Sequence, residues 1–140
     1  MAVAAALLAG ACAETGPAGD SIDERNTEAF SGIGENETVR FTGTEPFWGG
    51  EASASRLTYT TPEDIDGTSF AIERFAGNNG LLLSGVIDGD QFDLTITPGA
   101  CSDAMSDRTY PYVATLKIGE EVRTGCAWTD AQPFTGDPQP

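Results

Sequence analysis

Few residues of this sequence carry side chains suited to chemistry, and their types exclude most catalytic sites. The chain has no histidine, so it offers no Ser-His or Cys-His pair for nucleophilic catalysis and no histidine ligand for a metal. Its only lysine is Lys117, and no glycine loop of the Walker or dinucleotide-binding type is present. We therefore expect a non-enzymatic protein with no catalytic residue, no metal site and no cofactor.

Carboxylates are abundant, but their number weakens any specific interpretation. The 140 residues include 22 Asp and Glu against 7 Lys and Arg, a formal net charge of −15. With so many acids, some pair lies close by chance, and the segments 64–67 (DIDG) and 88–90 (DGD) lack the full spacing of a calcium loop. This charge repels nucleic acid, so we expect either a cationic protein partner or an acidic surface that simply keeps the chain soluble.

The first of three cysteines, Cys12, follows a short apolar segment. That segment is too short to span a bilayer, which takes about 20 residues, and is typical of the apolar region of a secretion signal. Small residues at 9–11 precede Cys12 much as they do in the bacterial lipobox, which predicts a signal peptide over residues 1–12 and a lipid anchor on Cys12. The alternative is ordinary signal cleavage after Ala11 or Ala13.

The other two cysteines form an even pair once Cys12 is lipidated. In an oxidising compartment, Cys101 and Cys126 are expected to close into one disulfide. The pair lacks the spacing of a redox Cys-x-x-Cys motif, so a structural bridge is the better interpretation.

Composition divides the chain into three parts after the signal. Residues 13–38 are rich in Gly, Ser, Asp and Glu and predict a flexible tether, and the proline-rich residues 129–140 predict a disordered tail. The folded part is then a single domain over residues 39–128, which we expect to be a monomer.

Within this domain the apolar residues alternate with a period of two, which predicts β-strands. The strand over 91–97 turns Phe92, Leu94 and Ile96 inward, and the strand over 121–128 is predicted to turn Cys126 and Trp128 inward. Asp-Gly at 88–89 and Gly-Glu at 119–120 mark tight hairpins. Seven or eight short strands without long crossovers predict an all-β, antiparallel meander that closes into a small barrel or a tight sandwich.

Two motifs remain as candidates for binding. In GTEPFWGG, over residues 43–50, Pro46 forces Glu45 into an extended conformation, so Phe47 and Trp48 point to opposite faces and one of them stays outside the core. In CSDAMSDRTYPY, over residues 101–112, a loop held by the disulfide carries charged side chains.

We hypothesise that Glu45 and Arg108 meet at one end of the barrel. One interpretation is a structural plug in which Arg108 also reaches Asp103 or Asp107. The other is a binding rim in which an aromatic ring stacks on a ligand and the charges orient it. The residues of this predicted rim are Glu45, Phe47, Trp48, Asp103, Asp107 and Arg108.

The segments FTGTEPFWGG, PGACSDAMSDRTYPY and GCAW together resemble a family of uncharacterised bacterial envelope lipoproteins. The resemblance covers residues 41–128 and implies a small periplasm-facing lipoprotein. Because Ala13 is not an inner-membrane retention Asp, we expect the outer membrane. We expect a non-catalytic binding module of unknown ligand. The alternative is an inhibitor of a cationic hydrolase such as lysozyme, by analogy with other small acidic barrel lipoproteins.

Overall fold

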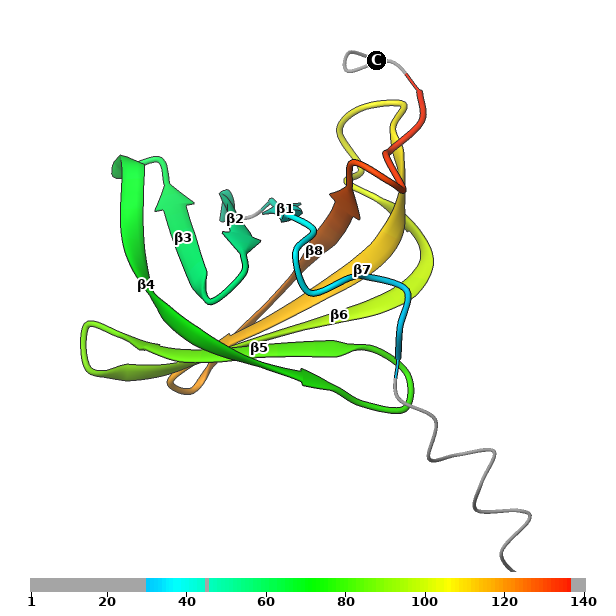
Figure 1. Ribbon diagram of the computed structural model, residues 1–140. Helices are drawn as coiled ribbons and strands as arrows, with labels where there is room; N and C mark the ends of the chain where they lie inside the picture. The colour runs from blue at the N-terminus through cyan, green and yellow to red at the C-terminus, as the bar shows by residue number, and fades with distance from the viewer. Residues whose placement is uncertain (1–29, 45, 137–140) are drawn as a thin grey trace, which may run out of the picture.

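The computed structural model describes residues 30–44 and 46–136, which form eight strands and no helix (Figure 1). None of the described residues forms a helix long and apolar enough to cross a membrane. In chain order the strands are β1 (Val39–Gly43), β2 (Trp48–Ser53), β3 (Arg56–Thr61), β4 (Asp64–Ala76), β5 (Leu81–Ile87), β6 (Asp90–Ser102), β7 (Thr109–Ile118) and β8 (Glu121–Thr129).

The strands form a closed antiparallel barrel. Each strand pairs with the next along the chain, and β1 pairs with β8 to close the sheet. The predicted all-β meander is therefore confirmed, and the barrel rather than the sandwich is the form it takes. The turn at Asp88 and Gly89 has positive φ at both residues, 51° and 87°, which matches the tight hairpin expected there.

Side chains fill the interior of the barrel. Phe92, Leu94 and Ile96 of β6 are fully buried, as their alternation predicts. A series of aromatic rings crosses the interior, with centroid separations between 4.9 and 6.5 Å, through Phe41, Trp48, Tyr59, Phe92 and Phe70. The interior is thus a packed core of the kind that small barrels have.

The predicted orientation of β8 is wrong by one residue. Leu116 of β7 points inward and pairs with Arg123, and Ala114 pairs with Gly125, so the inward residues of β8 are the odd-numbered ones. Cys126 and Trp128 consequently lie on the outer face of the barrel. The physical reason is volume, because the aromatic rings of β1 to β3 occupy the interior and leave room there for Gly and Ala.

The outer face of β8 is nevertheless covered at Cys126 and partly covered at Trp128. The β6–β7 hairpin extends past the barrel wall, seen in yellow in Figure 1, and the predicted bridge between Cys101 and Cys126 ties it to β8. The two Cα atoms are 5.6 Å apart, and the Cys101 sulfur lies 3.3 Å from the carbonyl oxygen of Gly125. Cys126 is 1% exposed although it lies outside the barrel, whereas Cys101 is half-buried.

Parts of both flanking segments pack against the barrel, although their composition predicts a flexible tether and a disordered tail. In the segment predicted as a tether, Ile33 is buried in the core and Phe30 packs against Tyr112. In the segment predicted as a disordered tail, Phe134 packs on Trp128. Residues 1–29, with Cys12 and the predicted signal, and residues 137–140 lie outside the described part of the chain.

We expect the disulfide to supply a large share of the stability of this domain. Replacing both cysteines by alanine should lower the free energy of unfolding by roughly 3 to 4 kcal/mol, because the bridge spans 25 residues and its loss enlarges the unfolded ensemble. Urea unfolding of the variant and the wild type measures this difference. Reductant should destabilise the wild type by a similar amount and leave the variant unchanged, and a variant as stable as the wild type would refute the expectation.

Candidate functional site

The turn between β1 and β2 separates its two aromatic residues, as predicted. Trp48 is 3% exposed and packs inside the barrel, whereas Phe47 is 51% exposed. A side chain at Gly43 would collide with the Trp48 indole, so the two glycine-flanked strands are shaped around this ring. Glu45 lies outside the described residues, and its predicted contact with Arg108 stays a prediction.

The indole N–H of Trp48 is buried without a hydrogen-bond partner among the described residues. An indole N–H that is removed from water without a partner costs free energy, and most buried indoles find an acceptor. The Nε1 atom lies against Gly43, one of the residues that line a groove near this turn.

That groove, which we call the β1–β3 groove, lies on the outer wall and has a volume of about 430 Å³. Gly49 and Gly50 form part of its lining, and the absence of side chains there leaves the wall open. Its apolar lining includes Phe47, Ile65 and Trp128, and Ile65 is 78% exposed. Threonine hydroxyls complete it, from Thr42, Thr60 and Thr61.

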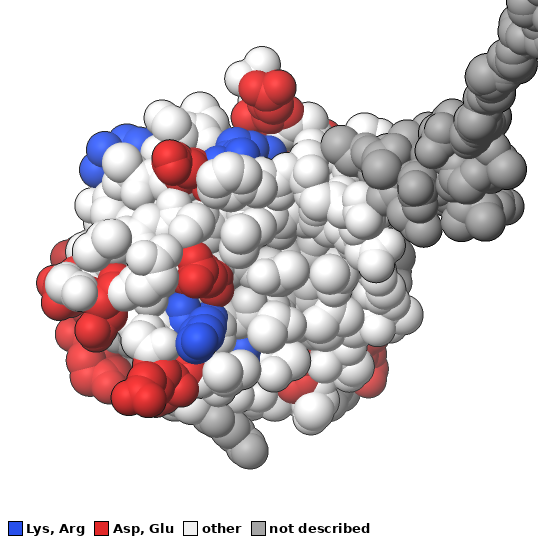
Figure 2. Space-filling model, turned by 90° about the horizontal axis from the view of Figure 1, so that it is seen from below, with Lys and Arg blue, Asp and Glu red and all other residues white. Residues whose placement is uncertain are grey.

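Exposed carboxylates border the groove. Glu63, Asp64 and Asp66 lie in and just after the β3–β4 turn, beside the lining residues Pro62 and Ile65. Further acids lie in the β5–β6 and β7–β8 turns. Figure 2 shows acidic side chains gathered toward the left of the view from below. The β5–β6 turn lies on this same side in Figure 1. No group of three His, Cys, Asp or Glu residues in the described part of the chain is arranged to hold a metal ion.

The loop after Cys101 is organised around Asp103. Its carboxylate accepts hydrogen bonds from the backbone N–H groups of Met105 and Ser106, from the Ser106 hydroxyl and from the Tyr110 hydroxyl. Burial alone would raise the pKa of Asp103, but these hydrogen bonds outweigh it and hold the pKa below its usual range. Asp103 is thus a structural residue of the loop and its oxygens are occupied.

Arg108 does not make the predicted contacts with Asp103 or Asp107 in the described structure. Its guanidinium lies 4.0 Å from the centroid of the Phe134 ring, a cation–π contact. The reason is that loop donors already occupy the Asp103 carboxylate, so the guanidinium stacks on the nearest aromatic ring. Phe134 was not predicted from the sequence. The available signal was a single large aromatic residue in a polar, proline-rich tail.

Trp128 connects the two halves of the predicted rim. It lines the β1–β3 groove together with Phe47, and on the other side its ring packs against Tyr110 with centroids 5.3 Å apart. The arrangement offers stacking surfaces, hydroxyl groups and bordering negative charge, which are features of recognition. No protein-family model matches this chain, and searches of curated proteins and of solved structures find no similar protein.

The low pKa of Asp103 predicts a pH-dependent loss of stability. Because the folded pKa lies below the unfolded value of about 3.9, the ionised carboxylate stabilises the fold above that pH, and the contribution is lost as the pH falls through the folded pKa. At pH 7, Asp103→Asn should lower the free energy of unfolding by about 1 kcal/mol, because the amide is a weaker acceptor. Urea unfolding between pH 7 and pH 2 should show this gap shrink below about pH 4.

The matched control is Asp107→Asn in the same loop. The loop donors of the described structure bond the Asp103 carboxylate and not the exposed Asp107 carboxylate, so Asp107→Asn should keep the wild-type free energy of unfolding at pH 7. If the difference in free energy of unfolding between Asp103→Asn and the wild type stays constant down to pH 2, the role of the ionised carboxylate is contradicted.

Proposed function

We propose that this chain is a non-catalytic binding module that holds a cationic polypeptide segment in the β1–β3 groove. The observation that carries the proposal is the pair Phe47 and Ile65, which line one groove while remaining 51% and 78% exposed. Exposed large apolar side chains that share a concave surface are typical of interaction sites.

The groove favours a peptide-sized ligand over a buried small molecule. The barrel interior is filled with aromatic and aliphatic side chains, so a ligand binds on the wall. An apolar side chain of the partner fits between Phe47, Ile65 and Trp128, and the threonine hydroxyls offer hydrogen bonds to its backbone.

Charge supports a cationic partner. The chain carries a net charge of −15, and Glu63, Asp64 and Asp66 lie exposed beside the groove. Such an arrangement accelerates the encounter with a basic partner and disfavours acidic ones. A basic hydrolase such as lysozyme is one protein of this class, and its inhibition is the second candidate function that the charge favours.

The proposed location is the bacterial cell envelope, facing the periplasm, with Cys12 as the lipid anchor in the outer membrane. This part of the proposal rests on the N-terminal sequence and on the resemblance of the three segments FTGTEPFWGG, PGACSDAMSDRTYPY and GCAW, because Cys12 lies outside the described residues. The Cys101–Cys126 disulfide is consistent with an oxidising compartment of this kind.

The groove is tested with a synthetic lysine-rich peptide that carries one central leucine. Ile65→Ser and Phe47→Ser should each weaken its binding about tenfold, because partial burial of each side chain is worth roughly 1 to 2 kcal/mol. The dissociation constant is measured by isothermal titration at low salt, and higher salt should weaken binding in all proteins alike.

Val86→Ser is the matched control, since Val86 on β5 is 57% exposed and lies outside the groove. It should bind the peptide as the wild type does. If the Ile65→Ser variant binds the peptide as tightly as the wild type does, the groove is refuted as the site. If a peptide with every lysine replaced by glutamine binds as tightly as the original peptide, the charge preference is refuted. Titration of lysozyme activity at low salt decides the second candidate, which is rejected if micromolar protein leaves the activity unchanged.

A further inference from the structure

The outer wall of the barrel changes from charged to uncharged within one step along the strands. Cross-strand pairs in β4 to β7 form one row of outward side chains, Glu73, Ser84, Asp93 and Lys117. The same pairing forms the next row, one step nearer the β4–β5 turn, from Phe75, Leu82, Thr95 and Thr115. No side chain of this second row carries a charge, although the whole chain has a net charge of −15.

A groove lies over the uncharged row and the β4–β5 turn. It has a volume of about 370 Å³, and no charged residue lines it. Phe75 is 53% exposed, and the half-buried Leu82 on the neighbouring strand extends the apolar surface. Polar but neutral side chains complete the lining. We call the surface of Phe75, Asn79, Leu82, Thr95 and Thr97 the neutral wall.

The acidic side chains gather at the opposite end of the barrel. In an antiparallel meander every second turn lies at the same end, so the β3–β4, β5–β6 and β7–β8 turns lie together. Asp and Glu occupy positions 63, 64, 88, 90, 120 and 121 in and beside these turns, whereas the β4–β5 turn over 77–80 (GNNG) has none. Figure 2 looks at the β5 side of the barrel and shows acidic side chains at the left and a broad uncharged area in the centre and on the right.

The described chain begins beside the neutral wall. The N–H of Phe30 donates a hydrogen bond of 2.7 Å to the carbonyl oxygen of Gly77, and Gly77 lines the groove. The segment from Cys12, the proposed lipid anchor, to Phe30 reaches at most about 60 Å when extended. The anchored segment therefore meets the barrel at the neutral wall and does not have to pass around the molecule to bring this wall to a bilayer.

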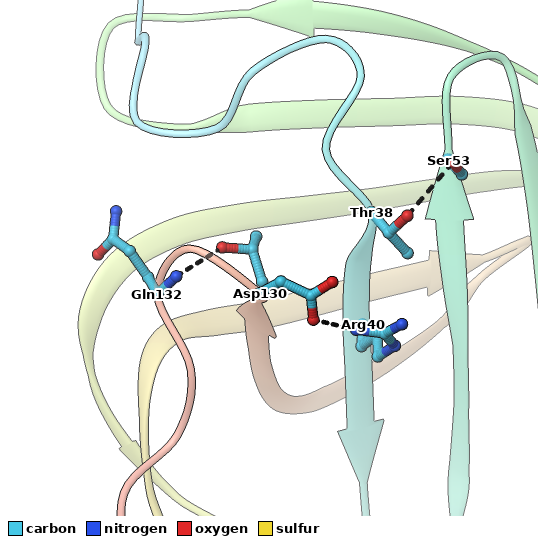
Figure 3. A network of polar contacts seen from close by, with 6 residues as sticks. Thr38, Arg40, Ser53, Asp130 and Gln132 are labelled. Carbon is cyan, nitrogen blue, oxygen red and sulfur yellow. Dashed lines mark hydrogen bonds and ion pairs between the residues drawn. The ribbon is translucent and has the colours of Figure 1, made fainter.

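The other charges at this end of the barrel include both signs. Figure 3 shows Arg40 paired with Asp130 at 2.6 Å, close to the end of β8. Arg74 of β4 donates to the carbonyl oxygen of Gly34 in the segment that precedes β1. An approach of this end to an anionic surface consequently meets less repulsion than an approach of the acidic turns does.

We propose that the neutral wall rests on the surface of the phospholipid bilayer to which Cys12 anchors the chain. Phe75 and Leu82 enter the boundary between headgroups and acyl chains, where aromatic and aliphatic side chains are stabilised. Asn79 and the threonine hydroxyls hydrogen-bond to lipid oxygens. The inference rests on the proposed lipid anchor and adds to it the orientation of the barrel.

The connection to the anchor favours the bilayer over a second copy or a soluble partner. A short tether keeps the wall at an effective concentration of the order of millimolar at the bilayer surface, so a contact of two apolar side chains is enough. A second signal beside a lipid chain is also a general feature of stable membrane attachment.

The orientation has a consequence for the β1–β3 groove. Phe47 and Ile65 lie in and beside turns at the acidic end, away from the β4–β5 turn. With the neutral wall on the bilayer, this end points into the periplasm, where a cationic partner reaches it.

The experiment couples Cys12, the only cysteine outside the disulfide, to a maleimide lipid in phosphatidylcholine nanodiscs. Doxyl-labelled lipid in the same nanodiscs broadens the NMR signals of nearby groups. The amide signals of Phe75, Asn79 and Leu82 should be broadened about fivefold more than that of Ile65, because only the wall contacts lipid. Replacing Phe75 and Leu82 together by serine should abolish this difference, and Phe75→Ser alone serves if the double variant fails to fold.

Val122→Ser is the matched control, since Val122 is 63% exposed and lies near the acidic end. It should leave the broadening as in the wild type. Equal broadening over the whole barrel, or broadening that the serine variants leave unchanged, would overturn the proposal. A dimer of uncoupled protein, seen by light scattering and abolished by Phe75→Ser, would assign the wall to a second copy and would also overturn it.

The same nanodiscs separate this proposal from those on which it rests. The lysine-rich peptide should bind coupled and uncoupled protein with equal affinity, and a loss on coupling would place the β1–β3 groove against the bilayer and contradict the orientation. Because the maleimide lipid supplies the anchor, failure of the wall to dock leaves the groove and the natural anchor untouched. Mass spectrometry of the mature protein from a bacterial envelope tests lipidation of Cys12 by itself.

Discussion

Closure of the barrel between β1 and β8 is the constraint on which the rest of the structure depends. A side chain at Gly125 would collide with the backbone of Thr42, so the two strands approach more closely than strands with side chains at this point allow. The inward residues of β8 that pair with β1 are Gly125, Ala127 and Thr129, which are small because the aromatic rings of β1 to β3 already fill the interior. The larger apolar residues of this part of β8, Cys126 and Trp128, then lie outside.

Apolar residues on the outside of a barrel need a cover, and the outer layer follows from this need. The β6–β7 hairpin extends over the wall, the Cys101–Cys126 disulfide fixes it there, and Tyr110 packs on Trp128. Phe134 from the end of the chain completes the layer. The β1–β3 groove therefore borders this outer layer through Trp128, whereas side chains pack the barrel interior.

The sequence predicted the barrel well because alternation is a local property. The period of two predicts the inward residues of β6, the Asp-Gly sequence predicts the tight turn at Asp88, and the number of cysteines predicts the pair. The orientation of β8 could not be predicted in this way. Alternation defines two faces but does not say which is inside, and choosing the more apolar face is wrong where the interior is already full.

The candidate site was predictable only in part, for a related reason. The opposite placement of Phe47 and Trp48 follows from their adjacency, and the structure shows it. The contact of Arg108 with Phe134 joins two segments that no local pattern relates, and composition suggested that the second was disordered. Trp128 lines the β1–β3 groove and also packs against Phe134, so the groove and the C-terminal segment belong to one outer layer.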